Sequence, residues 1–316
     1  MKKSFIKRIR DKMSVYLLVW RKYSFCSVFT PKPKHCLIQF IDGRTYHGGL
    51  SDRIISIVSV YALSKAIGID YKLSHTWPFR MENYLLPNKV NWIVSDKEIS
   101  DNYWNSQFIF IKSRLRKKIK VSKTRQIHVY AHSIVLEKVN EKYDKNYSFH
   151  DLFWELFSSN AALQVKIKSL QQSLNTEYDA FVFRFQNLLG DFKEGNCEVY
   201  APSAQEDLML KCIEFIRHYC VGGKNEKILI TSDSITFLQN AQKCLNNIVI
   251  VPGELTHMQY PTESGCYALY EKSFIDLLML SKARLITSVV YKDMYSSGFP
   301  RTASKIGMTD FVEIRL

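Results

Sequence analysis

The residues best suited to chemistry lie in four loops, each of which could contact a phosphate or another anion. In the first loop, Gly48 and Gly49 precede a helical pattern that begins at Ser51. Paired glycines let backbone N–H groups approach an anion, and the helix dipole favours negative charge at that end. A glycine pair before a helix is also a common turn, so this loop alone is a weak signal.

The second loop carries an arginine near the end of an otherwise apolar strand. Residues 180–185 read Ala-Phe-Val-Phe-Arg-Phe. Arg184 must be paired or face a polar cleft, because burying an isolated guanidinium is very costly. In a cleft, it could hold a diphosphate through two parallel hydrogen bonds. An internal ion pair with a carboxylate is the alternative, and the sequence leaves both open.

The remaining two loops join strands to helices. Ser232 and Asp233 either point into a cleft or cap the following helix, and capping is the better-supported interpretation. The Ser-Ser-Gly run at 296–298 opens the last helical pattern with hydroxyl and backbone donors. Upstream, Asp276 lies in an apolar helical pattern, where its charge requires a partner.

The elements that must position these loops alternate between strand and helix. Such alternation predicts parallel, doubly wound sheets, which bind ligands at the carboxyl ends of their strands. A length of 316 residues favours two domains. We expect strands at 36–41, 69–73, 108–111, 127–132, 178–185, 227–232, 247–251 and 284–290, and helices at 51–65, 203–220, 235–244, 273–283 and 297–306.

The net charge of +14 is concentrated in two segments. Residues 1–34 contain ten Lys or Arg and one acid, and residues 112–125 contain eight and no acid, so the rest is nearly neutral. A protein that binds DNA or RNA usually spreads basic and aromatic residues over a folded face. Two basic segments instead favour anionic lipid head groups or a phosphate-bearing acceptor. We therefore expect no nucleic-acid partner, and an anionic membrane surface is a candidate partner.

The N-terminal segment has the pattern of an amphipathic helix. This helix either lies on a membrane surface or packs on its own domain. The short apolar run 15–20 does not fit a signal peptide, and no run of 18 apolar residues exists. Seven cysteines without a Cys-x-x-Cys pair favour a reducing compartment. We expect a cytoplasmic protein, peripheral on the inner face of the cytoplasmic membrane. The apolar residues at helical spacing are Phe5, Ile6, Ile9, Met13, Tyr16, Leu17 and Trp20.

Taken in order, these motifs resemble those of the fucosyltransferase-type glycosyltransferases of the GT-B fold. This group includes bacterial α-1,2- and Nod-factor, core α-1,6- and protein O-fucosyltransferases. The run 48–53 resembles their Gly-Gly-Leu-Gly-Asn-Arg element, and 182–184 stands where they have His-x-Arg. The helix starting at Asp276 resembles their Asp-x-x-x-Leu-Ser helix, and 296–299 resembles their Ser-Ser-x-Phe phosphate loop. The likeness covers residues 36–75 and 178–306.

The resemblance implies an α/β GT-B fold, with two Rossmann-like domains facing a central cleft. A basic amphipathic segment, 1–35, would precede an acceptor-side domain, 36–165, and a nucleotide-sugar-binding domain, 166–316. The implied enzyme is an inverting glycosyltransferase that moves fucose from GDP-fucose to a bacterial surface glycan or glycolipid, in capsule, O-antigen or lipopolysaccharide. The implied function needs no metal or other cofactor, and the sequence lacks the Asp-x-Asp pair of metal-dependent transferases.

The resemblance also assigns roles to single residues. Arg184 would bind the donor diphosphate and stabilise its leaving charge, and Asp276 would hold the guanine or a partner arginine. A carboxylate must also accept the proton of the acceptor hydroxyl. Glu194 is the first candidate and Asp191 the second, with His47, on the acceptor side, as the third. The other implied donor-binding residues are Gly48, Gly49, Asp52, Ser296, Ser297 and Gly298.

Two other functions remain compatible with the sequence. One is a GT-B-like transferase with a different donor, a class that includes the polysaccharide pyruvyl transferases. The other is a non-enzymatic basic protein that binds nucleic acid, against which the nearly neutral remainder of the chain argues.

Overall fold

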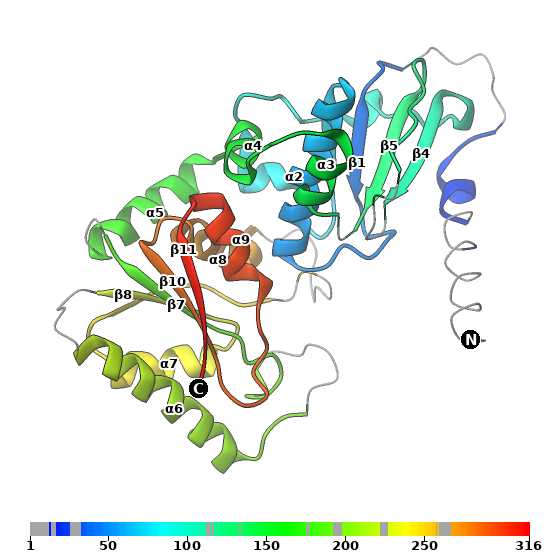
Figure 1. Cartoon of the computed structure of the whole chain (residues 1–316). Coiled ribbons are helices and arrows are strands. Elements are labelled where there is room, and N and C mark those ends of the chain that lie inside the picture. Colours follow the sequence, from blue (N-terminus) through cyan, green and yellow to red (C-terminus); the bar gives the residue numbers. More distant parts are fainter. Residues whose placement is uncertain are drawn as a thin grey trace. The chain divides into compact units, whose positions relative to one another are not determined.

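The chain forms two compact units, each built around a parallel β-sheet (Figure 1). Unit 1 draws on residues 1–47, 56–77 and 91–147, and unit 2 on residues 48–55, 78–90 and 148–316. The expected divisions at 35/36 and 165/166 stay predictions. The computed structural model describes residues 13, 17–25, 33–111, 115, 117–132, 134–174, 177–191, 198–221, 227–256, 258 and 267–316.

Unit 1 contains a four-stranded sheet in the order β2-β1-β5-β4, and every pairing in it is parallel. The strands of this sheet are β1 (Leu37–Ile41), β2 (Tyr71–His75), β4 (Ser106–Ile111) and β5 (Gln126–Ala131). Helix α2 (Leu50–Ile67) connects β1 to β2, and α3 (Leu136–Tyr143) follows β5. Asp52 in the first turn of α2 and Lys65 in its last turn complement the helix dipole. Short 3₁₀ turns occur at Met81–Asn83, Asp96–Glu98 and Tyr103–Asn105.

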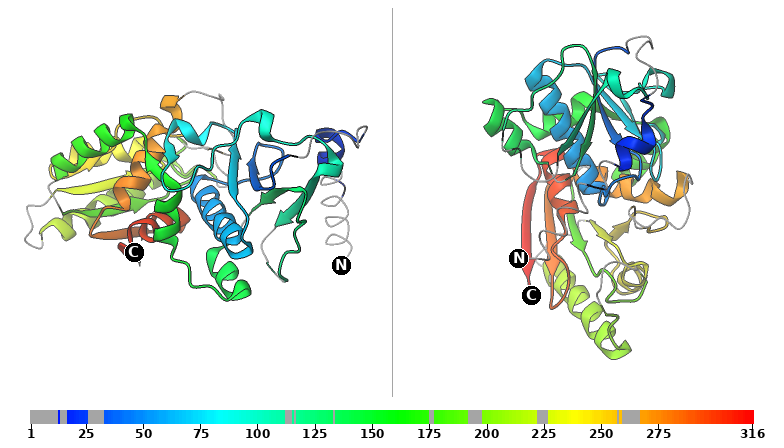
Figure 2. Two further views of the ribbon diagram at one scale, coloured as in Figure 1. Left: turned by 90° about the horizontal axis from the view of Figure 1, so that it is seen from above. Right: turned by 90° about the vertical axis from the view of Figure 1, so that its right-hand side faces the viewer.

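Unit 2 contains a five-stranded parallel sheet in the order β11-β10-β7-β8-β9, the arrangement of a doubly wound sheet. Helices α6 and α7 cover one face and α8 and α9 the other (Figures 1 and 2). The strands are β7 (Asp179–Phe183), β8 (Ile228–Ser232), β9 (Ile248–Ile250), β10 (Leu285–Val290) and β11 (Asp310–Arg315). The helices are α4 (Phe149–Leu156), α5 (Ala161–Leu174), α6 (Pro202–Val221), α7 (Ile235–Cys244), α8 (Tyr267–Leu280) and α9 (Gly298–Gly307). An antiparallel pair, β3 (Leu85–Pro87) and β6 (Phe157–Ser159), completes the unit.

Every strand expected from the sequence is present, with ends shifted by a few residues. The expectation for α8 was wrong at its start, because the helix begins at Tyr267 and not at residue 273. Helices α3, α4 and α5 and strand β11 were not expected. The last strand, β11, is an edge strand that pairs only with β10, and it is mostly half-buried or exposed, so it lacks the long apolar run of a central strand.

Residues 17–25 pack on unit 1, as the second interpretation of the N-terminal segment predicted. Leu18 lies in a buried cluster with Phe40 and Tyr130, among others. The backbone continues this contact, because the amide of Ser24 donates to Asp101 O at 2.8 Å. The expected apolar residues 5, 6, 9 and 16 lie outside the described residues. Within the described parts of the chain, no helix combines the length and apolar character needed to cross a bilayer.

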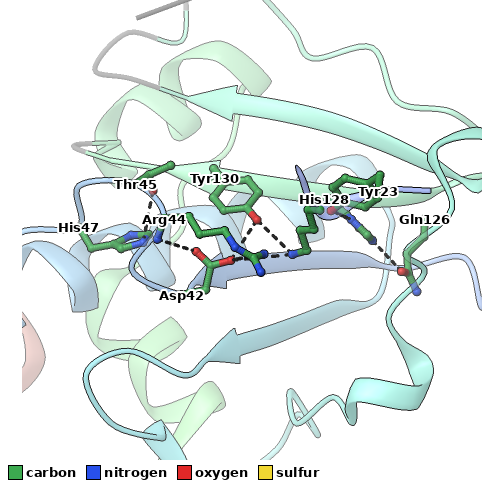
Figure 3. A network of polar contacts seen from close by, with 9 residues as sticks. Tyr23, Asp42, Arg44, Thr45, His47, Gln126, His128 and Tyr130 are labelled. Carbon is green, nitrogen blue, oxygen red and sulfur yellow. Dashed lines mark hydrogen bonds and ion pairs between the residues drawn. The ribbon is translucent and has the colours of Figure 1, made fainter. Parts of the chain in front are cut away.

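A buried histidine joins this segment to the sheet (Figure 3). His128 on β5 accepts a hydrogen bond at Nδ1 from the Tyr23 hydroxyl, at 2.6 Å, and its Nε2 donates to Gln126 Oε1 at 2.7 Å. Since an amide oxygen can only accept, Nε2 carries a proton, and in the neutral ring Nδ1 then accepts from the Tyr23 hydroxyl. Burial, and to a smaller extent the charge of Lys22, lowers the pKa of His128 to about 3.

This histidine makes the stability of unit 1 depend on pH. Below the ordinary histidine pKa of 6.5, the unfolded chain binds a proton that the folded chain excludes, so the free energy of unfolding should fall as the pH falls. The contribution of one such group is up to about 1.4 kcal/mol per pH unit. Urea unfolding at several pH values between about 7 and 5 should show this slope in the wild type and a smaller slope in His128→Gln.

His218→Gln is the matched control, because it removes a histidine from an exposed position on α6. This variant should keep the pH dependence of the wild type. Equal slopes in the wild type and His128→Gln would contradict the neutral, buried state of His128.

Candidate functional site

Arg184 and Asp233 form an ion pair at the carboxyl ends of two adjacent strands of unit 2. Arg184 follows β7 and Asp233 follows β8, and Arg184 Nε lies 3.3 Å from Asp233 Oδ2. The carboxylate also accepts the backbone amides of Phe185 and Gln186, at 2.8 and 2.7 Å. Burial raises the pKa of Asp233, while Arg184 and both amides oppose the shift. The arginine side chain remains 24% exposed, so it is paired and accessible at once.

Asp191 lies near this pair but is engaged by the start of helix α7. Its Oδ2 accepts hydrogen bonds from Ser234 Oγ and from the Thr236 amide, both at 2.8 Å. Ser234 is the N-cap of α7, which corrects the interpretation that Ser232 or Asp233 caps this helix. These contacts favour a structural role for Asp191, whose role as a base stays a prediction. Glu194 lies outside the described residues.

The loop between β10 and α9 lies beside the loop that follows β7. The Tyr295 amide donates to Arg184 O at 3.0 Å, which brings the two loops together. Ser297 is the N-cap of α9 and accepts the Phe299 amide at Oγ, while Ser296 Oγ donates to Glu313. The N-terminus of α9 therefore lies close to Arg184 along this loop.

The first turn of α2 contacts the first turn of α9 within unit 2. Ser51 Oγ lies 2.6 Å from Thr302 Oγ1, which in turn donates to the carbonyl of Gly298. Gly48 has a φ of +71° and is buried, and a side chain there would collide with the carboxylate of Asp52. Both the left-handed backbone conformation and the close approach of Asp52 disfavour a Cβ, so glycine fits this position best.

Arg53 stabilises the same glycine turn through a hydrogen bond to its backbone. Its guanidinium is buried and donates to Gly48 O at 3.1 Å and to Met258 O at 3.4 Å. This arginine therefore binds backbone carbonyls in the fold. The glycine turn that it supports leads directly into the N-terminus of α2.

Asp276 has a lysine as its partner, one helical turn earlier on α8. Lys272 Nζ donates to Asp276 Oδ2 at 2.8 Å, and both side chains are buried. Among the described residues, Asp276 Oδ1 accepts no hydrogen bond. Burial raises the pKa of Asp276, and Lys272 opposes this shift. An unsatisfied carboxylate oxygen in an apolar environment is unfavourable unless a donor completes it, so this atom could accept a donor from a ligand.

Several of these groups lie around the switch point of the unit 2 sheet. The chain crosses to opposite sides of the sheet from β7 and β10, and ligands of doubly wound sheets bind at this switch point. Arg184 and the N-termini of α9 and α2 adjoin it, and all three carry positive charge or partial positive charge. In the part of the chain that the structure describes, no group of three His, Cys, Asp or Glu side chains could hold a metal ion. The expectation of no metal stays a prediction.

Unit 1 carries a separate polar network at the carboxyl ends of β1 and β5 (Figure 3). Asp42 Oδ2 accepts from Tyr130 OH at 3.1 Å and from Arg44 at 3.2 Å, and Lys22 Nζ lies 3.8 Å away. Burial lowers the pKa of Lys22 to about 8, although Asp42 opposes the shift. His47, at the end of this loop, is buried, with Nε2 3.3 Å from Thr45 Oγ1. Its acceptor-side role stays a prediction.

Sequence reasoning missed three residues of the arrangement in unit 2. Asp233 was considered for a helix cap, whereas it supports the turn after β7 and pairs with Arg184. Lys272 was not considered, although its spacing of four residues from Asp276 on one helix is a readable signal. Arg53 was noted only as part of a motif, and nothing in the sequence identifies its carbonyl acceptors.

Comparison with known proteins supports the architecture. No protein-family profile and no curated protein matches the sequence. Among solved structures, the NodZ α-1,6-fucosyltransferase of Bradyrhizobium, co-crystallised with GDP, matches with a TM-score of 0.52 and 11% identity, over 85% of this chain and 92% of NodZ. A mutant of Arabidopsis thaliana FUT1 in complex with GDP matches with a TM-score of 0.54 and 10% identity, over 95% of this chain and 74% of FUT1.

At such low identity, these matches establish the fold and not the activity. They agree with the parallel sheets of both units and confirm the fold class predicted from the motifs, whereas the central cleft stays a prediction. The chain therefore has the α/β fold of the fucosyltransferase-type GT-B glycosyltransferases.

Proposed function

We propose that this protein is an inverting glycosyltransferase that uses GDP-fucose as its donor. The observation that carries the proposal is the convergence of Arg184 with the N-termini of α9 and α2 at the switch point of unit 2. A nucleoside diphosphate presents the negative charge that such a set of groups stabilises. The fold is shared with structures of NodZ co-crystallised with GDP or soaked with GDP-fucose and of a FUT1 mutant in complex with GDP, which supports this donor.

In this proposal, unit 2 holds the donor through both ends of the nucleotide. Arg184 grips the diphosphate, and Ser297, Gly298 and the backbone amide of Ser296 donate to the β-phosphate from the start of α9. Gly48, Gly49 and Asp52 contribute from the start of α2. Asp276 accepts the guanine N–H groups through the oxygen that has no other hydrogen-bond partner among the described residues. Lys272 stabilises the charged form of that carboxylate and so opposes the effect of its burial.

The reaction would be a direct displacement at the anomeric carbon with inversion. The bond to the diphosphate oxygen breaks as the acceptor oxygen attacks, so negative charge grows on the leaving group. Arg184 is already oriented by Asp233 and needs no reorganisation to stabilise that charge. A base removes the proton of the acceptor hydroxyl, and Glu194 is our first choice because the carboxylate of Asp191 is engaged by α7.

The acceptor that we propose is a bacterial surface glycan or a glycolipid precursor of capsule, O-antigen or lipopolysaccharide. Such acceptors are assembled at the inner face of the cytoplasmic membrane, which is the location that we propose for this protein. His47 and the polar network of unit 1 are the acceptor-side candidates, since they lie at the carboxyl ends of β1 and β5.

Arg184→Lys should weaken GDP binding at least about tenfold, or about 1.4 kcal/mol, because lysine keeps the charge but loses the planar fork. Calorimetric titration of GDP into folded protein measures this loss. Arg217→Lys, at an exposed position on α6, is the control and should bind GDP like the wild type. Unchanged GDP affinity in Arg184→Lys would refute the assignment of this residue.

Transfer should persist in EDTA, because the arginine and the helix termini supply the charge stabilisation that a cation supplies in other transferases. The measurement is fucose transfer with and without chelator, followed by addition of Mg²⁺ or Mn²⁺. Loss of transfer in EDTA and recovery with either ion would overturn the metal-independent mechanism.

Glu194→Gln should lower the transfer rate by about 10²–10⁴-fold and leave GDP affinity unchanged, because a positioned base acts only on the chemical step. Asp191→Asn should affect stability more than transfer, since it removes an acceptor at the start of α7. If both variants transferred fucose at the wild-type rate, the base would lie elsewhere, and His47 would be tested next.

A thermal-shift screen separates this donor from the alternatives. GDP-fucose should stabilise the protein more than uridine-linked sugars or phosphoenolpyruvate do. Stabilisation by one of these other donors alone would identify a different GT-B-like transferase.

A further inference from the structure

The N-terminal segment presents an exposed apolar stripe on one side. Met13, Leu17 and Trp20 are spaced by four and three residues, and they are 58%, 48% and 69% exposed. Leu17 and Trp20 lie in the described helical residues 17–22, and a helix places residues three apart on one face. Large apolar side chains that are exposed together indicate a contact surface more often than single ones do.

The opposite side of the same segment is fixed to unit 1. Leu18 is buried in a cluster with Phe40 and Tyr130, and Tyr23 is buried against His128. Lys22 Nζ lies 3.4 Å from the centre of the Phe40 ring and donates to Tyr130 OH at 3.1 Å. Buried contacts therefore hold one side of the segment against unit 1. These contacts fix the orientation of the exposed residues on its other side.

Two further exposed aromatic residues lie at the end of this segment, one in the segment and one in contact with it. Phe25 is 42% exposed and Trp104 is 53% exposed. The indole N–H of Trp104 donates to Phe25 O at 3.3 Å, which holds the two residues together. We call the five residues Met13, Leu17, Trp20, Phe25 and Trp104 the apolar surface.

Basic charge accompanies the apolar surface. Residues 1–34 contain ten basic residues and one acid, and Arg21 is exposed among the residues that the structure describes. The described parts of both basic segments, residues 17–25 and 117–125, contact β4, an edge strand of the unit 1 sheet. Tyr23 of the first segment packs on Phe108 at a ring distance of 4.2 Å, and Lys120 O of the second segment accepts a hydrogen bond from Gln107.

We propose that the apolar surface of unit 1 binds the surface of an anionic lipid bilayer. Exposed Trp, Leu and Met side chains enter the boundary between head groups and acyl chains, and basic residues beside them attract anionic head groups. A second copy of the chain is a poorer occupant, because two segments with this excess of basic charge repel each other. The inference identifies the contact that the proposed location requires, and it can be tested without transferase activity.

The test compares binding of the full-length protein to vesicles with and without an anionic lipid. The wild type should co-sediment with phosphatidylcholine vesicles that contain phosphatidylglycerol and bind phosphatidylcholine alone much more weakly. The double variant Leu17→Glu/Trp20→Glu should bind the anionic vesicles at least about tenfold more weakly, because it replaces apolar contacts with repelled charges. Both residues are exposed, so folding should be preserved, as circular dichroism can verify.

Two controls separate this surface from general effects. Val165→Glu adds negative charge at a 70% exposed apolar position on α5 of unit 2 and should bind vesicles nearly like the wild type. GDP titration of the double variant should match the wild type, so failure of the donor site and failure of the membrane surface give different results.

Equal vesicle binding by the wild type and the double variant would overturn the proposal, as would a wild type that ignores anionic vesicles. Binding to a short RNA in place of vesicles, or a dimer that the double variant abolishes while vesicle binding persists, would also overturn it. Sedimentation velocity and an RNA-binding assay under the same salt conditions detect these two outcomes.

Discussion

The carboxylate of Asp233 is the constraint on which the candidate site depends. It lies at the end of β8 and accepts the amides of Phe185 and Gln186, the two residues that follow the arginine at the end of β7. Gln186 has a φ of +54°, a conformation that needs support in a residue with a side chain. The same carboxylate pairs with Arg184. One buried acid thus determines the course of the loop and the direction of its guanidinium.

That constraint follows from strand order. Because β8 pairs with β7 in parallel register, the residue after β8 reaches the residues after β7. Because β10 pairs with β7 on the other side, the Tyr295 loop meets the same residues. A buried carboxylate that lost these partners would be left with an unfavourable charge, so the pair and the two amides are expected to form together.

The N-terminal segment has one side buried against unit 1 and another side exposed. Tyr23 and Lys22 are fixed by polar contacts with His128 and Asp42, and Leu18 by apolar packing. The segment is therefore part of unit 1, and its exposed residues are attached to a backbone that buried contacts hold in place. An apolar side chain on such a backbone loses less conformational freedom on contact with a partner than one on a flexible chain.

The sequence by itself determined the alternation of strands and helices, the loops that carry polar residues, and the family whose fold the chain shares. These features depend on local periodicity and on short motifs, both of which are readable without a structure. The motif order alone led to the fold that the solved structures support, although identity to them is only 10–11%. The sequence did not predict helices α3, α4 and α5, and it placed the start of α8 too late.

Only the tertiary structure decided which residues meet. The contact of Ser51 with Thr302 joins residues that are 251 positions apart, and it brings the starts of α2 and α9 together. The partners of Arg184 and Arg53 were equally unreadable, because a charged side chain can be satisfied by many acids or carbonyls, and strand order selects among them. The sequence also left open whether the N-terminal segment lies on a membrane surface or packs on its own domain. The burial of Leu18 and Tyr23 shows that residues 17–25 pack on unit 1, which the sequence could not reveal because burial depends on the surface that the fold provides.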